Sequence, residues 1–99
     1  MKKLLNKSII IQRAKHMWVD RLRSYIVFVN GQQVGKIKNG EEMRIKVNNG
    51  IHNVHLKIDW EESNKLEILV KNKNIYLECG NNRSSRLIGG NWIYLREKI

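Results

Sequence analysis

Three Asn-Gly pairs divide the first half of the chain into short segments, and they constrain its fold more than any other feature. They are Asn30-Gly31, Asn39-Gly40 and Asn49-Gly50, and each stands between runs in which apolar and polar residues alternate. Asn and Gly tolerate the positive φ angles that type I′ turns need, and these turns twist in the same sense as the strands they join. The pattern therefore predicts β-hairpins, with Gly31, Gly40 and Gly50 as structural turn residues that fix the strand register.

Alternation with a period of two residues continues along most of the chain, and the apolar spacing typical of helices is nearly absent. The runs recur at intervals of about 8–12 residues, which is typical of a β-sandwich or a small barrel. We therefore predict an all-β protein, a small antiparallel β-sandwich of seven to eight short strands joined by Asn-Gly hairpin turns. The expected strands are residues 8–13, 24–30, 33–37, 42–48, 52–59, 65–71, 75–79 and 92–97.

A length of 99 residues is that of one domain with one core. We expect this domain to cover residues 1–99, with its core at about 8–80, a flexible connection at 81–91 and the last strand at 92–97. Residues 61–64 are expected to form a polar loop.

The N-terminal stretch MKKLLNKSIII has basic residues followed by apolar ones, the order found in secretory signal peptides. Such a signal needs an unbroken apolar run of about 7–15 residues. Asn6, Lys7 and Ser8 interrupt this one, so we expect neither a signal peptide nor a transmembrane segment. The single cysteine, Cys79, leaves no internal disulfide and favours a reduced compartment. The expected location is the cytoplasm, including the cytoplasmic face of a membrane.

The formal net charge is +10, and the basic residues are concentrated toward the two ends of the chain. Residues 1–38 carry nine Lys or Arg and one Asp, and residues 71–99 carry six basic and two acidic residues. In residues 39–70 the acidic groups outnumber the basic ones by six to four. Such a distribution can attract anionic lipid, nucleic acid or an acidic protein. The alternative is that the abundance of Asn, Ile and Lys reflects an AT-rich genome and that part of the basicity has no function.

The segment QRAKHMWVDRLRSY, residues 12–25, is the strongest functional candidate because cations and aromatic rings are interleaved in it. Basic groups bind phosphates, and an aromatic ring such as that of Trp18 can stack on a base. The structural alternative is that Trp18 and Leu22 cap the open end of the sandwich while the charges stay solvated. A second stretch, residues 81–92, has two arginines and a Gly-Gly pair, which could cradle an anion or form a flexible connection. The candidate anion- or nucleic-acid-binding residues are Arg13, Lys15, Trp18, Arg21, Arg23, Arg83 and Arg86.

The histidines, the cysteine and the paired carboxylates argue against catalysis. His52 and His55 are three residues apart in an expected strand, so they face opposite sides and cannot ligate one metal. We expect the His52 imidazole to hydrogen-bond a nearby carbonyl. Cys79 has the parity of the inward-facing residues before it, which predicts a buried thiol rather than a nucleophile. The carboxylates at 61–62 are expected to be solvated. We therefore expect no catalytic residue, no metal site and no cofactor.

Several of these strands and turns resemble PEGA-type domains, which are small bacterial β-sandwich modules. The resemblance rests on Tyr25–Gly31, Val34-Gly35, Asn39-Gly40 and the run Gly50-x-His52-x-Val54. They match a hairpin V-x-V-(D/N)-G-x-x-V-G and a later strand G-x-H-x-V. The Pro-Glu-Gly-Ala tetrapeptide of these domains is replaced by Val47-Asn48-Asn49-Gly50. The resemblance implies an Ig-like or PEGA-like sandwich and no particular ligand.

From residue 9 to residue 80 the chain also resembles a group of small uncharacterised bacterial proteins. The shared stretches include KIDWEESNKLE at 57–67 and LECG at 77–80. Members of that group often carry an apolar, membrane-like segment after the Glu-Cys-Gly position, where this chain has the polar NNRSSRLIGGN.

The sequence thus predicts a non-enzymatic binding or scaffold module of bacterial type, whose partner is a protein or an anionic surface. Two alternatives remain open. One is a weak nucleic-acid-binding domain that uses the basic segment 13–23. The other is a peripheral membrane or envelope adaptor, by analogy with PEGA modules.

Overall fold

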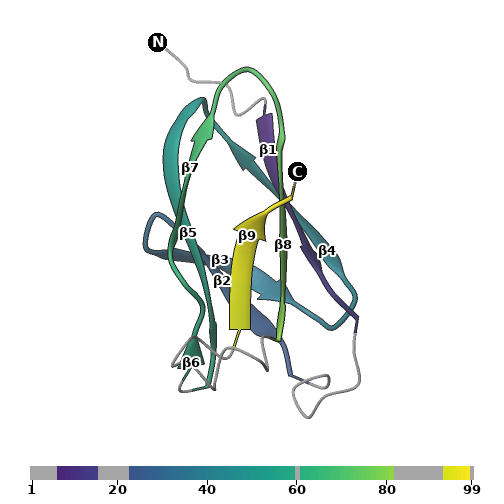
Figure 1. Ribbon diagram of the computed structural model, residues 1–99. Helices are drawn as coiled ribbons and strands as arrows, with labels where there is room; N and C mark the ends of the chain where they lie inside the picture. The colour runs from purple at the N-terminus through teal and green to yellow at the C-terminus, as the bar shows by residue number, and fades with distance from the viewer. Residues whose placement is uncertain (1–6, 16–22, 60, 82–92, 99) are drawn as a thin grey trace.

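The structure is a computed structural model that describes residues 7–15, 23–59, 61–81 and 93–98 (Figure 1). The all-β expectation is confirmed, since these residues form nine strands. Eight of them lie where strands were expected, and the ninth, β6, falls in the expected loop at 61–64. The strands are β1 Lys7–Arg13, β2 Tyr25–Val29, β3 Gln32–Ile37, β4 Glu42–Val47, β5 Gly50–Ile58, β6 Glu61–Glu62, β7 Leu66–Val70, β8 Ile75–Asn81 and β9 Ile93–Glu97.

The strands form two sheets that share one core (Figure 1). The four-stranded sheet has the order β4-β1-β8-β9, and the five-stranded sheet has the order β3-β2-β5-β6, with β7 also paired to β5. The strand pairs are antiparallel, as predicted, except that β1 and β8 are parallel. The reason is the β7–β8 connection, which returns the chain to the four-stranded sheet at the end where β1 begins. Strand β8 therefore starts beside the start of β1 and runs the same way.

Asn30-Gly31 forms the predicted hairpin turn. It joins β2 to β3, which are antiparallel neighbours. The φ angles are 54° at Asn30 and 82° at Gly31, as a type I′ turn requires at its two central residues. The prediction for Gly31 is therefore confirmed.

Gly40 and Gly50 also have positive φ angles, of 77° and 133°, but neither closes a hairpin. Strands β3 and β4 belong to different sheets, and so do β4 and β5. Residues 38–41 form a β-turn in which the N–H of Glu41 donates to the carbonyl of Lys38 (2.9 Å). The chain uses this turn, and the bend at Gly50, to cross between the two sheets. The hairpin expectation fails there because local turn chemistry does not determine which sheet the next strand joins.

Inward-facing side chains of both sheets pack into one hydrophobic core, and the predicted inward residues of β5, β7 and β8 contact it. In β1 the alternation is incomplete, because Ser8 and Ile10 are buried as well as Ile9 and Ile11. Burying one such aliphatic side chain stabilises the fold by about 1.5–3 kcal/mol. Strand β9 contributes Ile93 and Leu95, each 1% exposed, so the core extends past residue 80. The buried core residues are Ile9, Ile11, Tyr25, Val27, Val29, Ile37, Val47, Val54, Leu56, Ile68, Val70, Ile75, Leu77, Cys79, Ile93 and Leu95.

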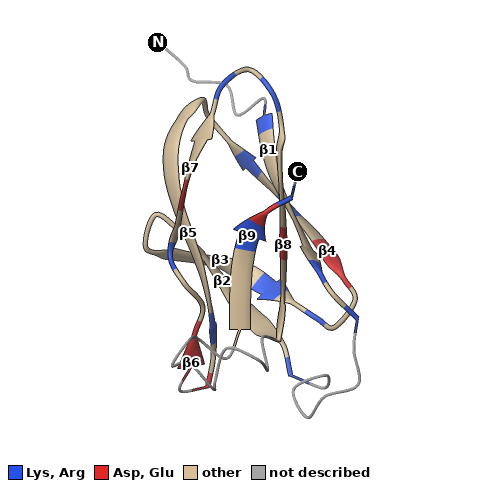
Figure 2. Ribbon diagram, in the orientation of Figure 1, with Lys and Arg blue, Asp and Glu red and all other residues tan. Residues whose placement is uncertain are grey.

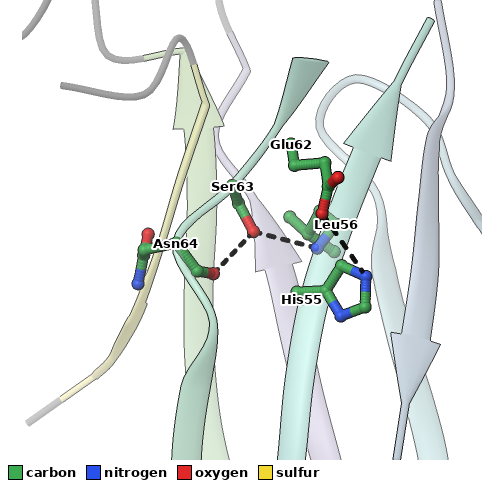
Figure 3. A network of polar contacts seen from close by, with 5 residues as sticks. All are labelled: His55, Leu56, Glu62, Ser63 and Asn64. Atoms are coloured by element: carbon green, nitrogen blue, oxygen red, sulfur yellow. Dashed lines mark hydrogen bonds and ion pairs between the residues drawn. The ribbon is translucent and has the colours of Figure 1, made fainter. Parts of the chain in front are cut away.

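The edge formed by β6 and β7 is one strand interrupted at Ser63 and Asn64. Ser63 keeps the pairing with β5, because its N–H donates to the Leu56 carbonyl (2.9 Å) and its hydroxyl accepts from the Leu56 N–H (2.9 Å) (Figure 3). Asn64 instead reaches to the other sheet. Its Nδ2 donates to the Leu95 carbonyl (2.8 Å), and its Oδ1 accepts from the Leu95 N–H (3.0 Å). This side-chain amide joins the two sheets along one edge as a backbone pair would.

Candidate functional site

Four lysines lie at the end of the sandwich where the β4–β5 and β7–β8 connections lie (Figure 2). We call this group the basic end; its members are Lys7, Lys46, Lys71 and Lys73. Lys7 is half-buried and the other three are exposed. The connections at 47–50 and 70–75 contain no acidic residue, and along β7 the first acidic residue away from this end is Glu67. The charges of the basic end therefore reinforce one another.

The pairing of β1 brings lysines from three strands or turns together. Ser8 is paired with Lys46 on β4, and its N–H donates to Asn74 Oδ1 (2.9 Å) in the β7–β8 connection. Lys7 precedes Ser8 and Lys73 precedes Asn74, so this hydrogen bond brings the two lysines to the same end of the β1–β8 pair. Lys46 and Lys73 thus lie on the two sides of the start of β1.

Two asparagines join the β4–β5 connection to the β7–β8 connection, which carries Lys71 and Lys73. The Asn72 N–H donates to Asn49 Oδ1 (2.9 Å), and Asn49 Nδ2 donates to Asn72 Oδ1 (2.9 Å). Asn72 itself has a φ angle of 58°, which asparagine tolerates better than most residues. The reciprocal bonds hold Lys71 and Lys73, on either side of Asn72, at the tip of the sandwich.

This geometry suits an extended anionic partner. Lysine ammonium groups act as mobile point charges and impose no planar geometry on the group they bind. Cations spread over a tip and the adjoining outer face of a sheet attract several phosphates or carboxylates at once, through their summed potential.

The structure places Arg13, a predicted phosphate contact, inside the protein. Its side chain is 2% exposed, and its guanidinium carbon lies 3.6 Å from the centroid of the Tyr25 ring. Nη1 donates to the backbone carbonyls of Arg23 (2.6 Å) and Ile37 (3.0 Å). Inward parity with Ile9 and Ile11 explains this position. Arg13 ties β1 to the start of β2 and the end of β3 and does not reach a surface ligand.

The other predicted contacts do not form one site in the described residues. Arg23 pairs with Asp59 at the surface, and Lys15 is exposed with its aliphatic stem lying over Gly40. The remaining candidates, Trp18, Arg21, Arg83 and Arg86, lie outside the described residues.

Cys79 is buried, as predicted, and points into the core opposite Arg13 across the β1–β8 pair. Burial raises the pKa of the thiol from 9.0 to about 12, and the Arg13 charge only partly offsets this. The sulfur therefore stays protonated at neutral pH, which excludes it as a nucleophile in this conformation.

His52 and His55 lie on opposite faces of β5, as predicted. The carbonyl of Asn48 can only accept, so His52 Nε2 donates to it (2.8 Å) and Nδ1 accepts from Asn30 Nδ2 (3.0 Å). Asn30 Oδ1 in turn accepts from the Asn53 N–H (2.9 Å). This imidazole is used to join the Asn30-Gly31 hairpin to the β4–β5 connection.

His55, Glu62 and Ser63 lie close together but do not form a catalytic triad (Figure 3). The hydroxyl of Ser63, a residue that is 3% exposed, donates to the Asn64 carbonyl (2.8 Å) and accepts from the backbone of β5. His55 instead stacks on Phe28, with ring centroids 4.8 Å apart, and its Nε2 lies 3.9 Å from Glu62 Oε1.

Burial lowers the pKa of His55 below its ordinary value of 6.5, and Lys65 and Lys57 lower it further. The Glu62 carboxylate opposes this shift without cancelling it. The ring is therefore neutral near pH 7 and packs as an aromatic side chain.

A hollow of about 410 Å³ opens at the far end of β1 from the basic end. Two of its charged walls are bridged by a neutral amide: Gln12 Nε2 donates to Glu42 Oε1 (3.1 Å), and Lys98 Nζ donates to Gln12 Oε1 (2.6 Å). In the described ranges no group of three or more His, Cys, Asp or Glu side chains could hold a metal ion. The hollow therefore has the character of a solvated polar surface.

Sequence reasoning missed the basic end because its members are far apart along the chain. Only the turn Lys71-Asn72-Lys73 carries a local signal, namely two cations in a turn without an acidic neighbour. The pairing of β1 with β4 and β8, which adds Lys7 and Lys46, is decided by the tertiary structure.

Searches against protein-family models, curated proteins and solved structures found no match to this chain. The resemblance to PEGA-type domains therefore stays a prediction from the residues. Within the described part of the chain, no helix has the length and apolar character needed to cross a membrane.

Proposed function

We propose that this protein is a non-enzymatic binding module that holds an anionic partner at its basic end. The observation that carries the proposal is the convergence of four lysines from β1, β4 and the β7–β8 connection on one end of the sandwich. Two hydrogen-bonded connections hold that end, and the residues of those connections include no carboxylate. A scaffold that only had to fold would lose stability by placing these like charges together.

The chemistry of the remaining polar residues supports a binding role over a catalytic one. Four of these side chains have structural roles: those of Arg13, His52 and Ser63 hydrogen-bond to the backbone, and that of Cys79 is buried in the core. The resemblance of the first hairpin and of the strand around His52 to PEGA-type modules is consistent with this role.

The test compares two variants of equal net charge on immobilised heparin, a sulfated polyanion. One variant carries Lys71→Glu and Lys73→Glu at the basic end. The other carries Lys36→Glu and Lys65→Glu, which are exposed residues elsewhere on the described surface. Each pair replaces two positive charges by two negative ones, a change of four from the formal +10 to +6.

We expect the basic-end variant to elute at clearly lower salt than the control variant, because polyanion affinity depends on the cations that touch the polymer. Circular dichroism melts establish that both variants are folded. Equal elution of the two variants would mean that binding follows net charge alone, and the proposal would then be wrong.

A further inference from the structure

Two large aliphatic side chains are exposed next to the basic end. Ile51 is 62% exposed and Leu69 is 58% exposed. They are direct partners in the β5–β7 pair, one step in from Gly50 and Val70. Strand alternation places them on the outer face of the five-stranded sheet, because Val70 and Ile68 face the core.

The aliphatic pair and the lysines form one continuous surface. Lys71 follows Val70 directly and is two residues from Leu69. Lys73 and Lys7 lie beyond it at the tip, where their neighbours Asn74 and Ser8 are joined by a hydrogen bond. A partner that approaches this tip meets the cations and the apolar side chains together.

We infer that the anionic partner of the basic end is a lipid surface, such as the face of a membrane rich in anionic phospholipids, and that Ile51 and Leu69 enter its headgroup region. This inference rests on the proposed function and adds the class of partner. An interfacial protein gains affinity both from apolar side chains buried at the boundary of headgroups and acyl chains and from cations attracted to anionic lipid. The basic end supplies the cations, and Ile51 and Leu69 supply the apolar side chains.

The character of the surface favours lipid over nucleic acid. Surfaces that bind single-stranded nucleic acid pair their cations with aromatic rings that stack on bases, and isoleucine and leucine side chains cannot stack in this way. Tyr76, 48% exposed on the outer face of the other sheet, is a side chain that suits a membrane interface because it has an apolar ring and a polar tip.

The spread of the cations favours a planar anionic surface over one acidic protein. Lys7, Lys71 and Lys73 are at the tip, and Ile51 and Leu69 lie one step in from it on the outer face of the five-stranded sheet. A headgroup layer that meets the tip contacts these lysines together, because its charges are numerous and mobile.

The experiment is co-sedimentation of the full chain with two kinds of vesicle at near-physiological salt. One is phosphatidylcholine alone, and the other is phosphatidylcholine mixed with phosphatidylglycerol. The variants are Lys71→Glu with Lys73→Glu, and Ile51→Ser with Leu69→Ser. Val34→Ser is the matched apolar control, since Val34 is 44% exposed on β3.

We expect binding to the mixed vesicles and little binding to phosphatidylcholine. A basic residue near an anionic membrane contributes about 1 kcal/mol, which is about fivefold in the partition constant. The lysine variant should therefore lose at least about 25-fold. The Ile51–Leu69 variant should lose at least about tenfold, because apolar area no longer enters the headgroup region. Val34→Ser should bind as the unchanged chain does.

The outcomes separate this inference from the proposed function. If the basic end binds heparin but the chain does not bind mixed vesicles, the lipid inference is wrong and the proposed function stands. If neither probe depends on Lys71 and Lys73, both are wrong. Full binding by the Ile51–Leu69 variant overturns the lipid inference, as does tighter binding to a single-stranded oligonucleotide than to the mixed vesicles at the same salt.

Discussion

The guanidinium of Arg13 lies over the ring of Tyr25, with 3.6 Å between its central carbon and the ring centroid, inside the end of the sandwich. The two residues come from different sheets, and each is at most 2% exposed. An arginine over an aromatic face is stabilised by the ring quadrupole, and the attraction is larger where water is excluded. The contact therefore joins the two sheets at a place where an aliphatic core would otherwise end.

Replacing Arg13 tests this structural role. Arg13→Ala removes the contact with Tyr25 and leaves two backbone carbonyls, those of Arg23 and Ile37, without their charged donor. We expect a loss of about 2–4 kcal/mol in the free energy of unfolding. Arg13→Lys keeps the charge but not the guanidinium geometry and should lose part of this. Urea unfolding followed by circular dichroism measures both. An unchanged urea midpoint for Arg13→Ala would contradict this structural role and would favour Arg13 as a surface contact for anions.

Gly31 tests the predicted hairpin turn. Its φ angle is 82°, and a side chain added there would meet nothing within 4 Å, so any cost is that of the backbone conformation. Gly31→Val should destabilise the protein by more than about 1 kcal/mol, because a β-branched residue is strained at positive φ. Gly31→Asn is the control and should cost less, since asparagine adopts this region more readily. Thermal melts compare the two, and equal melting temperatures would show that the turn is not of this type.

Cys79 should make the stability of the protein fall at high pH. Its pKa is about 12 in the folded chain and 9.0 ordinarily, so the folded state holds the proton more tightly than the unfolded state does. The stabilisation is fully present below pH 9 and is lost as the pH rises from 9 toward 12. The loss has a limit of roughly 1.4 kcal/mol per pH unit. Unfolding of the unchanged chain and of Cys79→Ala, compared at several pH values, isolates this contribution from that of other groups; parallel curves would contradict it.

The same burial predicts slow chemistry at the sulfur. A thiol reagent such as a disulfide dye should label Cys79 slowly in the native protein and quickly in denaturant. Rapid labelling without denaturant would mean that β8 opens readily or that its inward parity is wrong.

Asn64 should control the edge where the two sheets meet. Asn64→Ala removes both hydrogen bonds to Leu95 and should lower the stability by about 1–3 kcal/mol. Asn64→Asp keeps the acceptor for the Leu95 N–H but places its second oxygen against the Leu95 carbonyl, so it should restore only one of the two bonds. Amide hydrogen exchange reports the change directly, because the Leu95 N–H should exchange faster in Asn64→Ala than in the unchanged chain. Protection of Leu95 that persists in Asn64→Ala would show that β9 is held without this side chain.

The sequence by itself determined the local structure. Alternation of apolar and polar residues placed eight of the described strands and the inward faces of most of them, because a side-chain period of two needs no knowledge of the partner strand. Position along the strand also placed Cys79 in the core and His52 and His55 on opposite faces. The Asn30-Gly31 turn was predicted from the φ preference of that residue pair alone.

Only the tertiary structure decided which strands pair and what each charge does. Gly40 and Gly50 have the positive φ angles that their residue types allow, yet they lead into another sheet, because the pairing is set by core packing across the whole domain. From its charge, Arg13 was predicted to be a surface contact, but its inward parity places it against Tyr25. There the backbone carbonyls of Arg23 and Ile37 accept the hydrogen bonds that water would otherwise accept. Lys7, Lys46 and Lys73 are distant in sequence and become neighbours only when β1 is paired on both sides. Charge acts through space, and the spatial order of these strands is a property of the folded chain that no local pattern contains.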